Sequence, residues 1–461
     1  MVSLDTTLRR VALPILDRSR YAWGAVTALR PSPLAWPAIG IAVASFAVLT
    51  VDAWRGKLGL VGLFWLTVAG LALWVGRRGL TPAARRPLDT TAKLLFTVVG
   101  MLALLRHPVP VGDGVELPIY DAILQYLPSV DRRTFVLFGL LAMLIKAVGV
   151  VSSACGWHLL LVGQRLRYPF WSAILTAFLI GRFIGTFLPS TIGLDGYTLY
   201  EAGRYSNQWS RAVTAKALEK LIGLTGLFLG MVLTLPFGYQ VILDVTSHLG
   251  RPAAAPLFAA LILLIGGGVS AGVMLVLVWP GLLTWAMTRF GRLLPGSLRG
   301  QLDGLTRAVG AYRGQVGLLF GVLLAKFVTH FTTAVVYYFT ALAIGVVGAH
   351  FWPIVFGSTI QILGTVLAPT IAGEGAREAF QALLLSKQLG GAAQAVLSAA
   401  LGFIVAEAAT LWGGLFILVR KPGWRPAFTY VDGQQVDYAW IDDREPVGFD
   451  AAKIAAASAS R

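Results

Sequence analysis

The sequence predicts an all-α fold, a polytopic integral membrane helical bundle with an inverted internal repeat and two opposed re-entrant hairpins. Hydrophobic residues make up 56% of the 461 residues and charged residues only 13%, a composition far outside the range of soluble domains. Apolar runs of about 18 residues or more, long enough to cross roughly 30 Å of hydrocarbon as helices, recur along the chain. One short motif also occurs twice, 179 positions apart.

The N-terminal part begins with residues 1–33, which we expect to be a cytoplasmic segment without a secretory signal peptide, because its arginines surround no compact apolar core. Residues 34–130 then supply three transmembrane helices and an outer loop. The three predicted crossings are Leu34–Val51, Leu58–Val75 and Leu88–Leu105.

The remaining apolar runs are of two kinds. Five are predicted to cross the membrane: Thr134–Leu161, Ala212–Pro236, Leu257–Trp279, Val316–Val347 and Ala392–Val419. Tyr168–Leu188 and Pro353–Ala368 instead run into a Pro and Gly cluster followed by an amphipathic stretch, which predicts hairpins that return to the side they entered from. Non-helical backbone at this depth requires shielding by protein or a wet cavity, because lipid satisfies no N–H or C=O group.

The basic residues set the expected orientation. The N-terminus, the loop around Arg77 and Arg85 and the basic loop before Val316 are expected in the cytoplasm, whereas the acidic segment around Glu116 suits the outside. This topology accounts for most of the net charge of +16 without nucleic acid. We therefore expect a multi-pass protein of a prokaryotic cytoplasmic membrane with both termini cytoplasmic, and hairpins that open to opposite sides.

The repeat is the strongest signal. IGTFLPSTIGLDG at 184–196 aligns with LGTVLAPTIAGEG at 363–375 without a gap, and Lys146 aligns with Lys326 at an offset of 180. The sequence thus divides into repeat 1 (134–236), a linker helix with a basic cytoplasmic loop (237–315), repeat 2 (316–419) and a cytoplasmic tail (420–461). One span between the copies inverts the second copy, an arrangement typical of transporters, although a duplicated bundle that is merely stable is the alternative.

Ionisable residues within the apolar runs are the candidate site, because charge inside a membrane is costly and usually functional or paired. The candidate substrate-binding residues are Lys146, Arg182, Asp195, Lys326, Glu374, Arg377 and Glu378. The four cations among them would bind phosphate, arginine through its fork and lysine as a point charge. Structural ion pairs that hold the hairpins in place are the alternative.

Glycines and acids mark the hairpin tips. Gly193, Gly196, Gly373 and Gly375 permit sharp turns and helix N-termini directed at an anion. The acids at these tips either cap those helices or relay protons, and the candidates for a relay are Asp195, Glu219, Glu374 and Glu407.

The same motifs carry a family resemblance. IAGEGAREAF at 371–380 resembles the Gly-x-Gly-x-Arg-Glu signature of the flippase-like membrane domain of lysylphosphatidylglycerol synthases, LPSTIGLDG at 188–196 is similar to its Pro and Gly-Gly-Asp motif, and Glu219-Lys220 falls where Glu-Arg is common. The resemblance covers about 134–420 and implies a stand-alone domain that moves an anionic or aminoacylated lipid, or handles a lipid-linked sugar carrier. Leu194 and Thr198 depart from the family pattern, and nothing resembles the aminoacyl-transferase domain.

The expected function is therefore a lipid translocator rather than an enzyme. It would move a phosphate-bearing or aminoacylated lipid, or a polyprenyl-phosphate-linked carrier, between leaflets. We expect no cofactor, no metal and no nucleic acid, because no Walker sequence or clustered His and Cys residues are present. The alternative is a membrane-embedded enzyme or accessory of glycolipid assembly that uses Asp195 or Glu374 as a base. A homo-oligomer or a lipid-biosynthesis partner stays open.

Overall fold

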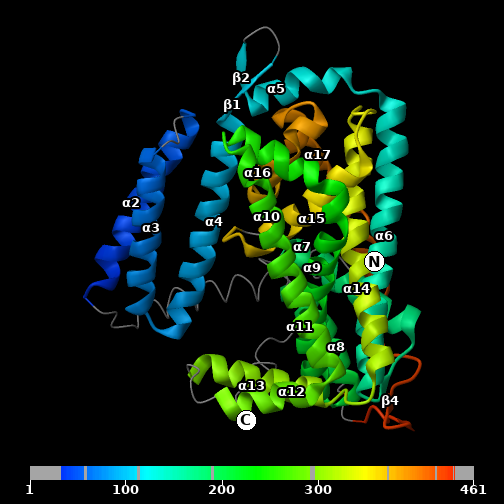
Figure 1. Cartoon of the computed structure of the whole chain (residues 1–461). Helices are drawn as coiled ribbons and strands as arrows, with labels where there is room; N and C mark the ends of the chain where they lie inside the picture. The colour runs from blue at the N-terminus through cyan, green and yellow to red at the C-terminus, as the bar shows by residue number, and fades with distance from the viewer. Residues whose placement is uncertain are drawn as a thin grey trace, which may run out of the picture. The chain divides into compact units, whose positions relative to one another are not determined.

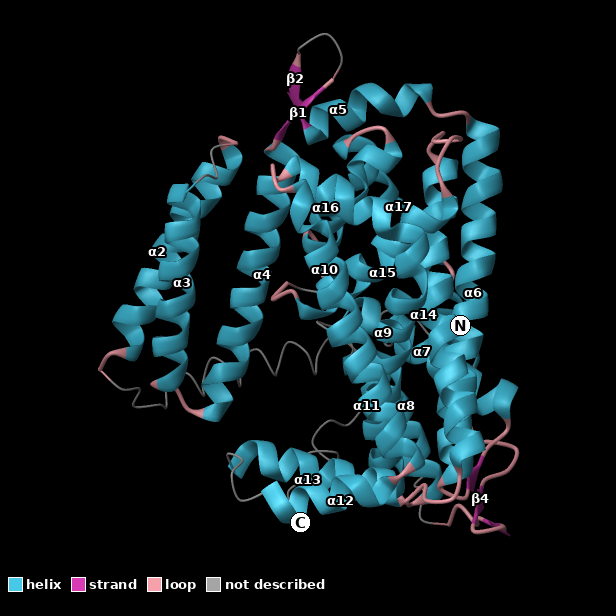
Figure 2. Cartoon of the chain, in the orientation of Figure 1, coloured by secondary structure: helices cyan, strands magenta, loops and turns pink. Residues whose placement is uncertain are grey.

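The computed structural model describes residues 33–56, 60–111, 115–187, 192–290, 296–370, 373–420, 423–439 and 441. About four fifths of them are helical (Figure 2), and seven helices among them are long and apolar enough to cross a membrane, which confirms the prediction of an all-α polytopic membrane protein. The predicted N-terminal segment 1–32, the hairpin tips 188–191 and 371–372, and 442–461 lie outside the described residues. The chain divides into two compact units, residues 1–126 with 365–379, and residues 127–364 with 380–461.

The first unit contains a group of three helices that coincide with the first three predicted crossings. They are α2 (Ala35–Trp54), α3 (Leu60–Arg78) and α4 (Pro82–Arg106). Pro82 occupies the first turn of α4, where its fixed φ and missing N–H are tolerated. Buried Phe46 packs edge-on against Phe96 with ring centroids 4.8 Å apart, and this contact joins α2 to α4. An antiparallel ribbon, β1 (Pro108–Pro110) and β2 (Glu116–Pro118), leads to α5 (Ile119–Tyr126).

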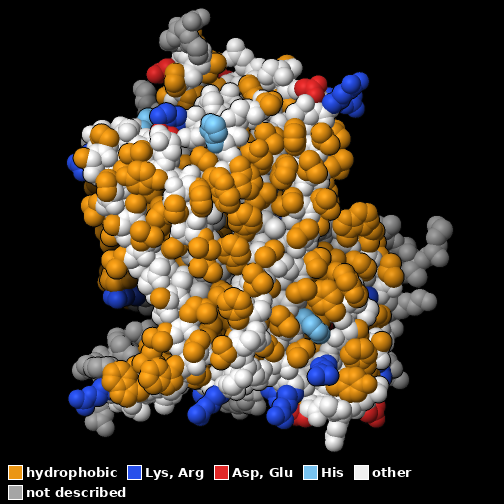
Figure 3. Space-filling view, turned by 45° about the vertical axis from the view of Figure 1, so that its right-hand side comes forward, with side chains coloured by type: hydrophobic (Ala, Val, Ile, Leu, Met, Phe, Trp, Pro, Cys, Tyr) orange, Lys and Arg blue, Asp and Glu red, His pale blue; other side chains and the backbone are white. Residues whose placement is uncertain are grey.

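The second unit is built on long helices. These are α6 (Arg132–Gly163), α9 (Trp209–His248), α14 (Val316–Ala343) and the pair α17 (Ala392–Ala408) and α18 (Trp412–Val419). A segmented span of η3 (Pro252–Ala254), α10 (Ala255–Ile262), η4 (Leu263–Gly267) and α11 (Gly268–Val278) follows α9, and η1 (Leu127–Ser129) precedes α6. Exposed side chains along these helices are largely hydrophobic (Figure 3), as expected for surfaces that face lipid.

The equivalent first helices of the two repeats, α6 and α14, pack together and run antiparallel. Thr329 Oγ1 donates to the carbonyl of Gly149 at 3.3 Å, and Tyr312 OH donates to the carbonyl of Leu160 at 2.7 Å. Advancing along α6 therefore means moving backwards along α14. The antiparallel direction of α6 and α14 agrees with the direction expected for the predicted inverted repeat, which itself stays a prediction.

Each predicted hairpin is a pair of helices. The first comprises the π-helical turn η2 (Phe170–Leu175), α7 (Thr176–Phe187) and α8 (Ile192–Ser206), and the second α15 (Phe351–Leu367) and α16 (Ala376–Leu389). Any side chain on Gly193 would collide with the backbone of Gly185, so the close approach of α7 and α8 requires glycine at position 193. In the second pair, Gly364 lies against the ring of Phe380.

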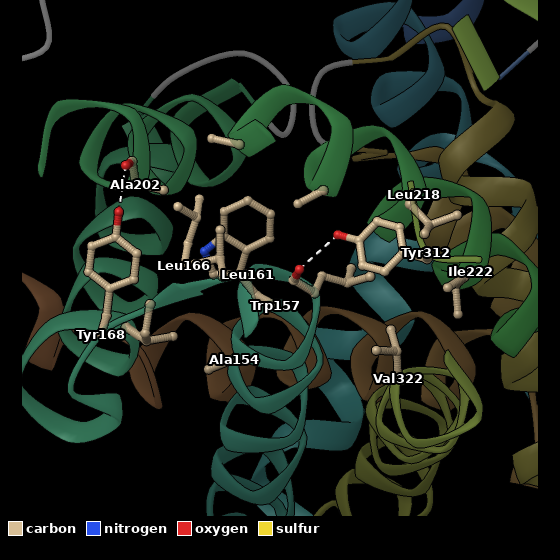
Figure 4. Close-up of a cluster of buried hydrophobic side chains, with 14 of the residues drawn as sticks. Ala154, Trp157, Leu161, Leu166, Tyr168, Ala202, Leu218, Ile222, Tyr312 and Val322 are labelled. Atoms are coloured by element: carbon tan, nitrogen blue, oxygen red, sulfur yellow. Dashed lines mark hydrogen bonds between the residues drawn. The ribbon is translucent and has the colours of Figure 1, made fainter. Parts of the chain in front are cut away.

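A buried hydrophobic cluster forms the core at one end of the second unit (Figure 4). Trp157 and Leu161 of α6 meet Leu218 and Ile222 of α9 there. The hydroxyl groups of buried Tyr168 and Tyr312 point to backbone carbonyls, which satisfies them inside an apolar environment.

The C-terminal residues are folded against this end rather than extended. β3 (Leu166–Arg167), β4 (Tyr430–Val431) and β5 (Gln434–Gln435) form a small antiparallel sheet. Helices α12 (Pro280–Phe290) and α13 (Gly296–Gly310) run across the long helices of this unit (Figure 1). The ring of Trp424 contacts Tyr205, so the tail is packed onto α8.

Candidate functional site

Charged side chains from six helices of the second unit form one connected network. Its members are Lys146 on α6, Arg182 on α7, Asp195 on α8, Lys216, Glu219 and Lys220 on α9, Lys326 on α14 and Glu407 on α17. Five cations thus face three anions. A surplus of positive charge inside a bundle of apolar helices either binds an anion or destabilises the fold.

Glu219 is the centre of this network. Its Oε1 lies 2.5 Å from Lys326 Nζ and its Oε2 lies 2.6 Å from Lys216 Nζ. The side chains of Glu219 and Lys326 are only 6% and 7% exposed. Burial of Lys216, Glu219 and Lys326 costs desolvation energy, and their mutual attraction offsets this cost only while all three charges are present.

Asp195 connects the first hairpin to the network. Its carboxylate forms an ion pair with Lys220 and lies 3.9 Å from Lys216 Nζ. Lys216 also donates a 2.8 Å hydrogen bond to Thr198 Oγ1, and its ammonium lies 3.8 Å from the centre of the Trp157 ring. Lys216 thus brings a cation from α9 next to Thr198, one of the two positions at which the first hairpin departs from the family pattern it resembles.

The two lysines of the repeat bind hydroxyl groups in a reciprocal way. Lys146 Nζ on α6 donates to Thr333 Oγ1 on α14 at 3.2 Å, and Lys326 Nζ on α14 donates to Ser153 Oγ on α6 at 3.0 Å. Thr333 lies seven residues after Lys326 in α14, and Ser153 lies seven residues after Lys146 in α6. Antiparallel packing of two equivalent helices produces this relationship, so the lysines occupy corresponding places in the two repeats.

The two lysines nevertheless differ in charge environment. Lys146 is 7% exposed and forms no salt bridge within the described part of the chain. The charged groups that act on it are Arg182 and Glu407. Glu407 accepts a hydrogen bond of 2.5 Å from Thr186 Oγ1. Lys146 is therefore the cation that Glu219 does not neutralise.

Arg182 is a second cation without a salt bridge among the described residues. Its Nε is buried with no hydrogen-bond partner, and its side chain makes no hydrogen bond or salt bridge to the residues that the structure describes. Glu407 and Asp195 are the acids nearest to it in electrostatic effect. An arginine fork left unfilled in a low-dielectric environment favours an incoming oxyanion.

The tip of the second hairpin belongs to the first unit and is organised differently. Arg377 and Glu378 are both buried and joined by a 2.8 Å ion pair, and Glu378 Oε2 also accepts the backbone N–H of Gly375 at 2.8 Å. Glu378, rather than Glu374, satisfies the free N–H at the start of α16. Glu374 makes no hydrogen bond or ion pair to a described residue. Gly373 and Gly375 have φ of +75° and +77°, a conformation that favours glycine.

The structure thus brings together Asp195, Glu219 and Lys326, and places Lys146, Arg182 and Glu407 in mutual electrostatic range. Sequence reasoning missed Lys216, although it lies three residues before Glu219 on one helix face, the spacing of a helical ion pair. It also missed Ser153 and Thr333. Their equal distance of seven residues from the two lysines was a readable signal.

These features define the class of protein. The described residues form a polytopic α-helical membrane protein with a buried, cation-rich network at the junction of two equivalent helices, and they contain no group of three or more His, Cys, Asp or Glu side chains that could hold a metal ion.

The family follows from the sequence match. Residues 120–416 match the model of the lysylphosphatidylglycerol synthase TM region, and the chain belongs to this family. No curated protein and no solved structure matches the chain significantly. The match includes every member of the network, from Lys146 to Glu407, so the site lies in the part of the chain that the family shares.

Proposed function

We propose that this protein translocates a phosphate-bearing lipid between the leaflets of its membrane, with Lys146 and Arg182 as the phosphate ligands. The observation that carries the proposal is that Lys146 and the Nε of Arg182 are buried among apolar helices, and that neither side chain has a salt-bridge partner among the described residues. A phosphate group would supply the charge that the network lacks. Membership of the family supports a role in lipid chemistry.

The hydroxyl groups near these cations support the same ligand. Thr333 already contacts Lys146, and Thr186 contacts Glu407. A phosphate has more acceptor oxygens than two cations satisfy, and hydroxyl donors complete such a shell. The Glu407 carboxylate would repel an arriving phosphate. Protonation of Glu407 would remove this repulsion, and phosphate binding would thus be coupled to proton uptake.

The relationship between the repeats supports movement from one side to the other. Lys146 and Lys326 occupy corresponding places on antiparallel helices, and only Lys326 is neutralised by Glu219. In inverted repeats, two similar halves exchange conformations and expose one site to either face in turn. In either of two alternating states the two lysines would have different surroundings. The pairing of Lys326, but not Lys146, with Glu219 is a difference of this kind.

The test is leaflet exchange of fluorescent phosphate-bearing lipids in proteoliposomes. We expect exchange above that of protein-free vesicles, reduced about tenfold or more in Lys146→Ala and Arg182→Gln, because a lost charge-assisted hydrogen bond of about 1.5–3 kcal/mol corresponds to a tenfold or larger effect. Lys387→Ala is the matched control, since Lys387 pairs with Asp244 but its side chain is 71% exposed.

Two outcomes would contradict the proposal. Exchange that equals protein-free vesicles for a broad lipid panel, with and without a proton gradient, would exclude autonomous translocation. Mass spectra of the recovered lipids separate transport from chemistry, because a translocator leaves its lipid unchanged whereas a transferase releases a leaving group. Chemically altered lipid would favour the enzyme alternative.

A further inference from the structure

The three N-terminal helices enclose an apolar groove that lies before the region matched by the family. Its volume is about 210 Å³, and Thr91 is the one polar residue in its lining. The lining comes from α2, α3, α4 and the turn between α3 and α4, and it includes Trp36, Phe46, Leu80, Pro87, Leu88 and Leu95. For comparison, an apolar cavity of about 150 Å³ suffices to bind a small hydrocarbon.

The length of the groove matches one leaflet. Its lining extends along α2 from Trp36 to Phe46 and along α4 from Ala84 to Leu95. At 1.5 Å per residue these stretches are about 15 Å long. The hydrocarbon core of a bilayer is about 30 Å thick, so the groove reaches from one interface to roughly the midplane. A single acyl chain of one leaflet has this extent.

Basic residues gather at the interfacial end of the groove. Leu80 and Ala84 both line it, and between Arg77 and Arg85 the chain turns from α3 into α4. Arg85 Nε donates to the carbonyls of Arg77 and Leu80 at 3.0 and 2.9 Å, which fixes the guanidinium beside the groove.

The local charge at this end is positive. Arg78 stacks on Trp74 at 3.7 Å, and Asp89 is paired with Arg77 at 3.1 Å. Trp36 is half exposed at the same end, where tryptophan side chains characteristically sit at the headgroup level. An apolar groove with a cationic, aromatic rim is complementary to a lipid that combines an acyl chain with a negative headgroup.

We propose that this groove binds one acyl chain of an anionic phospholipid, with its phosphate at Arg85. This site is separate from the network of the second unit, and its occupation does not depend on translocation. The bound lipid fills a space that the protein leaves open within its own three-helix group. Charge selects the lipid, because each basic residue near a membrane surface favours anionic lipid about fivefold.

Photo-crosslinking of the full chain in vesicles tests the proposal. The probes are phosphatidylglycerol and phosphatidylcholine that carry a diazirine midway along one acyl chain, and peptide mass spectrometry locates the adducts. We expect phosphatidylglycerol to label the groove-lining residues of α2 and α4 at least fivefold more than phosphatidylcholine. Ala92→Trp fills the groove and should abolish this labelling, whereas Leu94→Trp, on the lipid-facing side of the same helix, should not.

The headgroup contribution is tested separately. Arg85→Gln should remove most of the preference for phosphatidylglycerol, and Arg85→Lys should retain it because the charge stays. Monodisperse elution and an unchanged unfolding temperature show that each variant is folded. Equal labelling by the two lipids, or labelling of the groove that persists in Ala92→Trp, would overturn the proposal whatever the result of the exchange assay.

Discussion

Lys326 of the second repeat and Glu219 of the first approach to 2.5 Å, deep among apolar helices, and this contact joins α14 to α9. Glu219 also binds Lys216, so one carboxylate serves two ammonium groups. Such an arrangement is weak as a source of stability but strongly interdependent, because each charge becomes costly once its partner is lost.

Removing the carboxylate should therefore destabilise the protein. Glu219→Gln leaves Lys216 and Lys326 buried without their main counter-charge, and we expect a loss of about 3–5 kcal/mol in unfolding free energy. Thermal unfolding in detergent measures it. The double variant Glu219→Leu with Lys326→Met should recover part of the loss, since it removes two charges together. A loss in the double variant equal to the sum of the losses in Glu219→Leu and Lys326→Met alone would show that the contact is not coupled.

The two lysines of the repeat should respond differently to neutralisation. Lys326→Met leaves Glu219 with one cation and should lower the unfolding temperature. Lys146→Met removes a buried charge that has no salt bridge within the described residues, so stability should stay equal or rise. Residues kept for function at a cost in stability behave in this way. A large loss of stability in Lys146→Met would assign Lys146 a structural role instead.

Close packing of α18 on α7 predicts the effect of a single methyl group. A side chain on Gly413 would overlap the carbonyl of Leu179, so Gly413→Ala should destabilise by about 1–3 kcal/mol. Gly139 on α6 has open space around it. Gly139→Ala should be neutral or stabilising by about 0.5–1 kcal/mol, because alanine is the better helix former. Denaturant unfolding of both variants compares them directly.

Acid should release the C-terminal sheet from α9. Arg211 donates two hydrogen bonds to Asp432, which lowers the pKa of this carboxyl below its ordinary value of 3.8. The contact is fully stabilising above the ordinary Asp pKa and is lost as the pH falls through the lowered one. Hydrogen exchange at the Asp432 amide, which donates to the carbonyl of Arg165, should accelerate there after correction for intrinsic rates. Asp432→Asn should remove this pH dependence, and its persistence would exclude Asp432 as the cause.

The predicted opposition of the hairpins is testable with single cysteines. Cys155 is the only cysteine, so Cys155→Ser gives a clean background. In that background Ser210→Cys, just after the first hairpin, should react with an impermeant thiol reagent from the cytoplasmic side. Ser386→Cys, at the end of the second hairpin, should react from the outside. Labelling of both positions from one side would exclude opposed hairpins.

The sequence was informative about the membrane fold for a specific physical reason. The length and apolarity of a span are local properties, so α6, α9 and α14 coincide with predicted crossings. The boundaries were less accurate. The span predicted as Ala212–Pro236 continues as α9 to His248, because Pro236 does not end the helix. The folded tail was not predicted, since it depends on pairing between Tyr430 and the distant Arg167.

The candidate site was predictable only in part. The repeat identified Lys146 and Lys326 because a duplicated motif is visible in one dimension. By itself, the sequence determined that this protein is a helical membrane protein, and it predicted an internal repeat and the charges that lie inside its spans. Which of those charges neutralise each other depended on the packing of helices far apart in the chain. The tertiary structure alone decided that Glu219 pairs with Lys326 and that Lys146 has no salt bridge among the described residues. The reason is that ion pairs depend on distances of a few ångströms between side chains that the sequence order does not place.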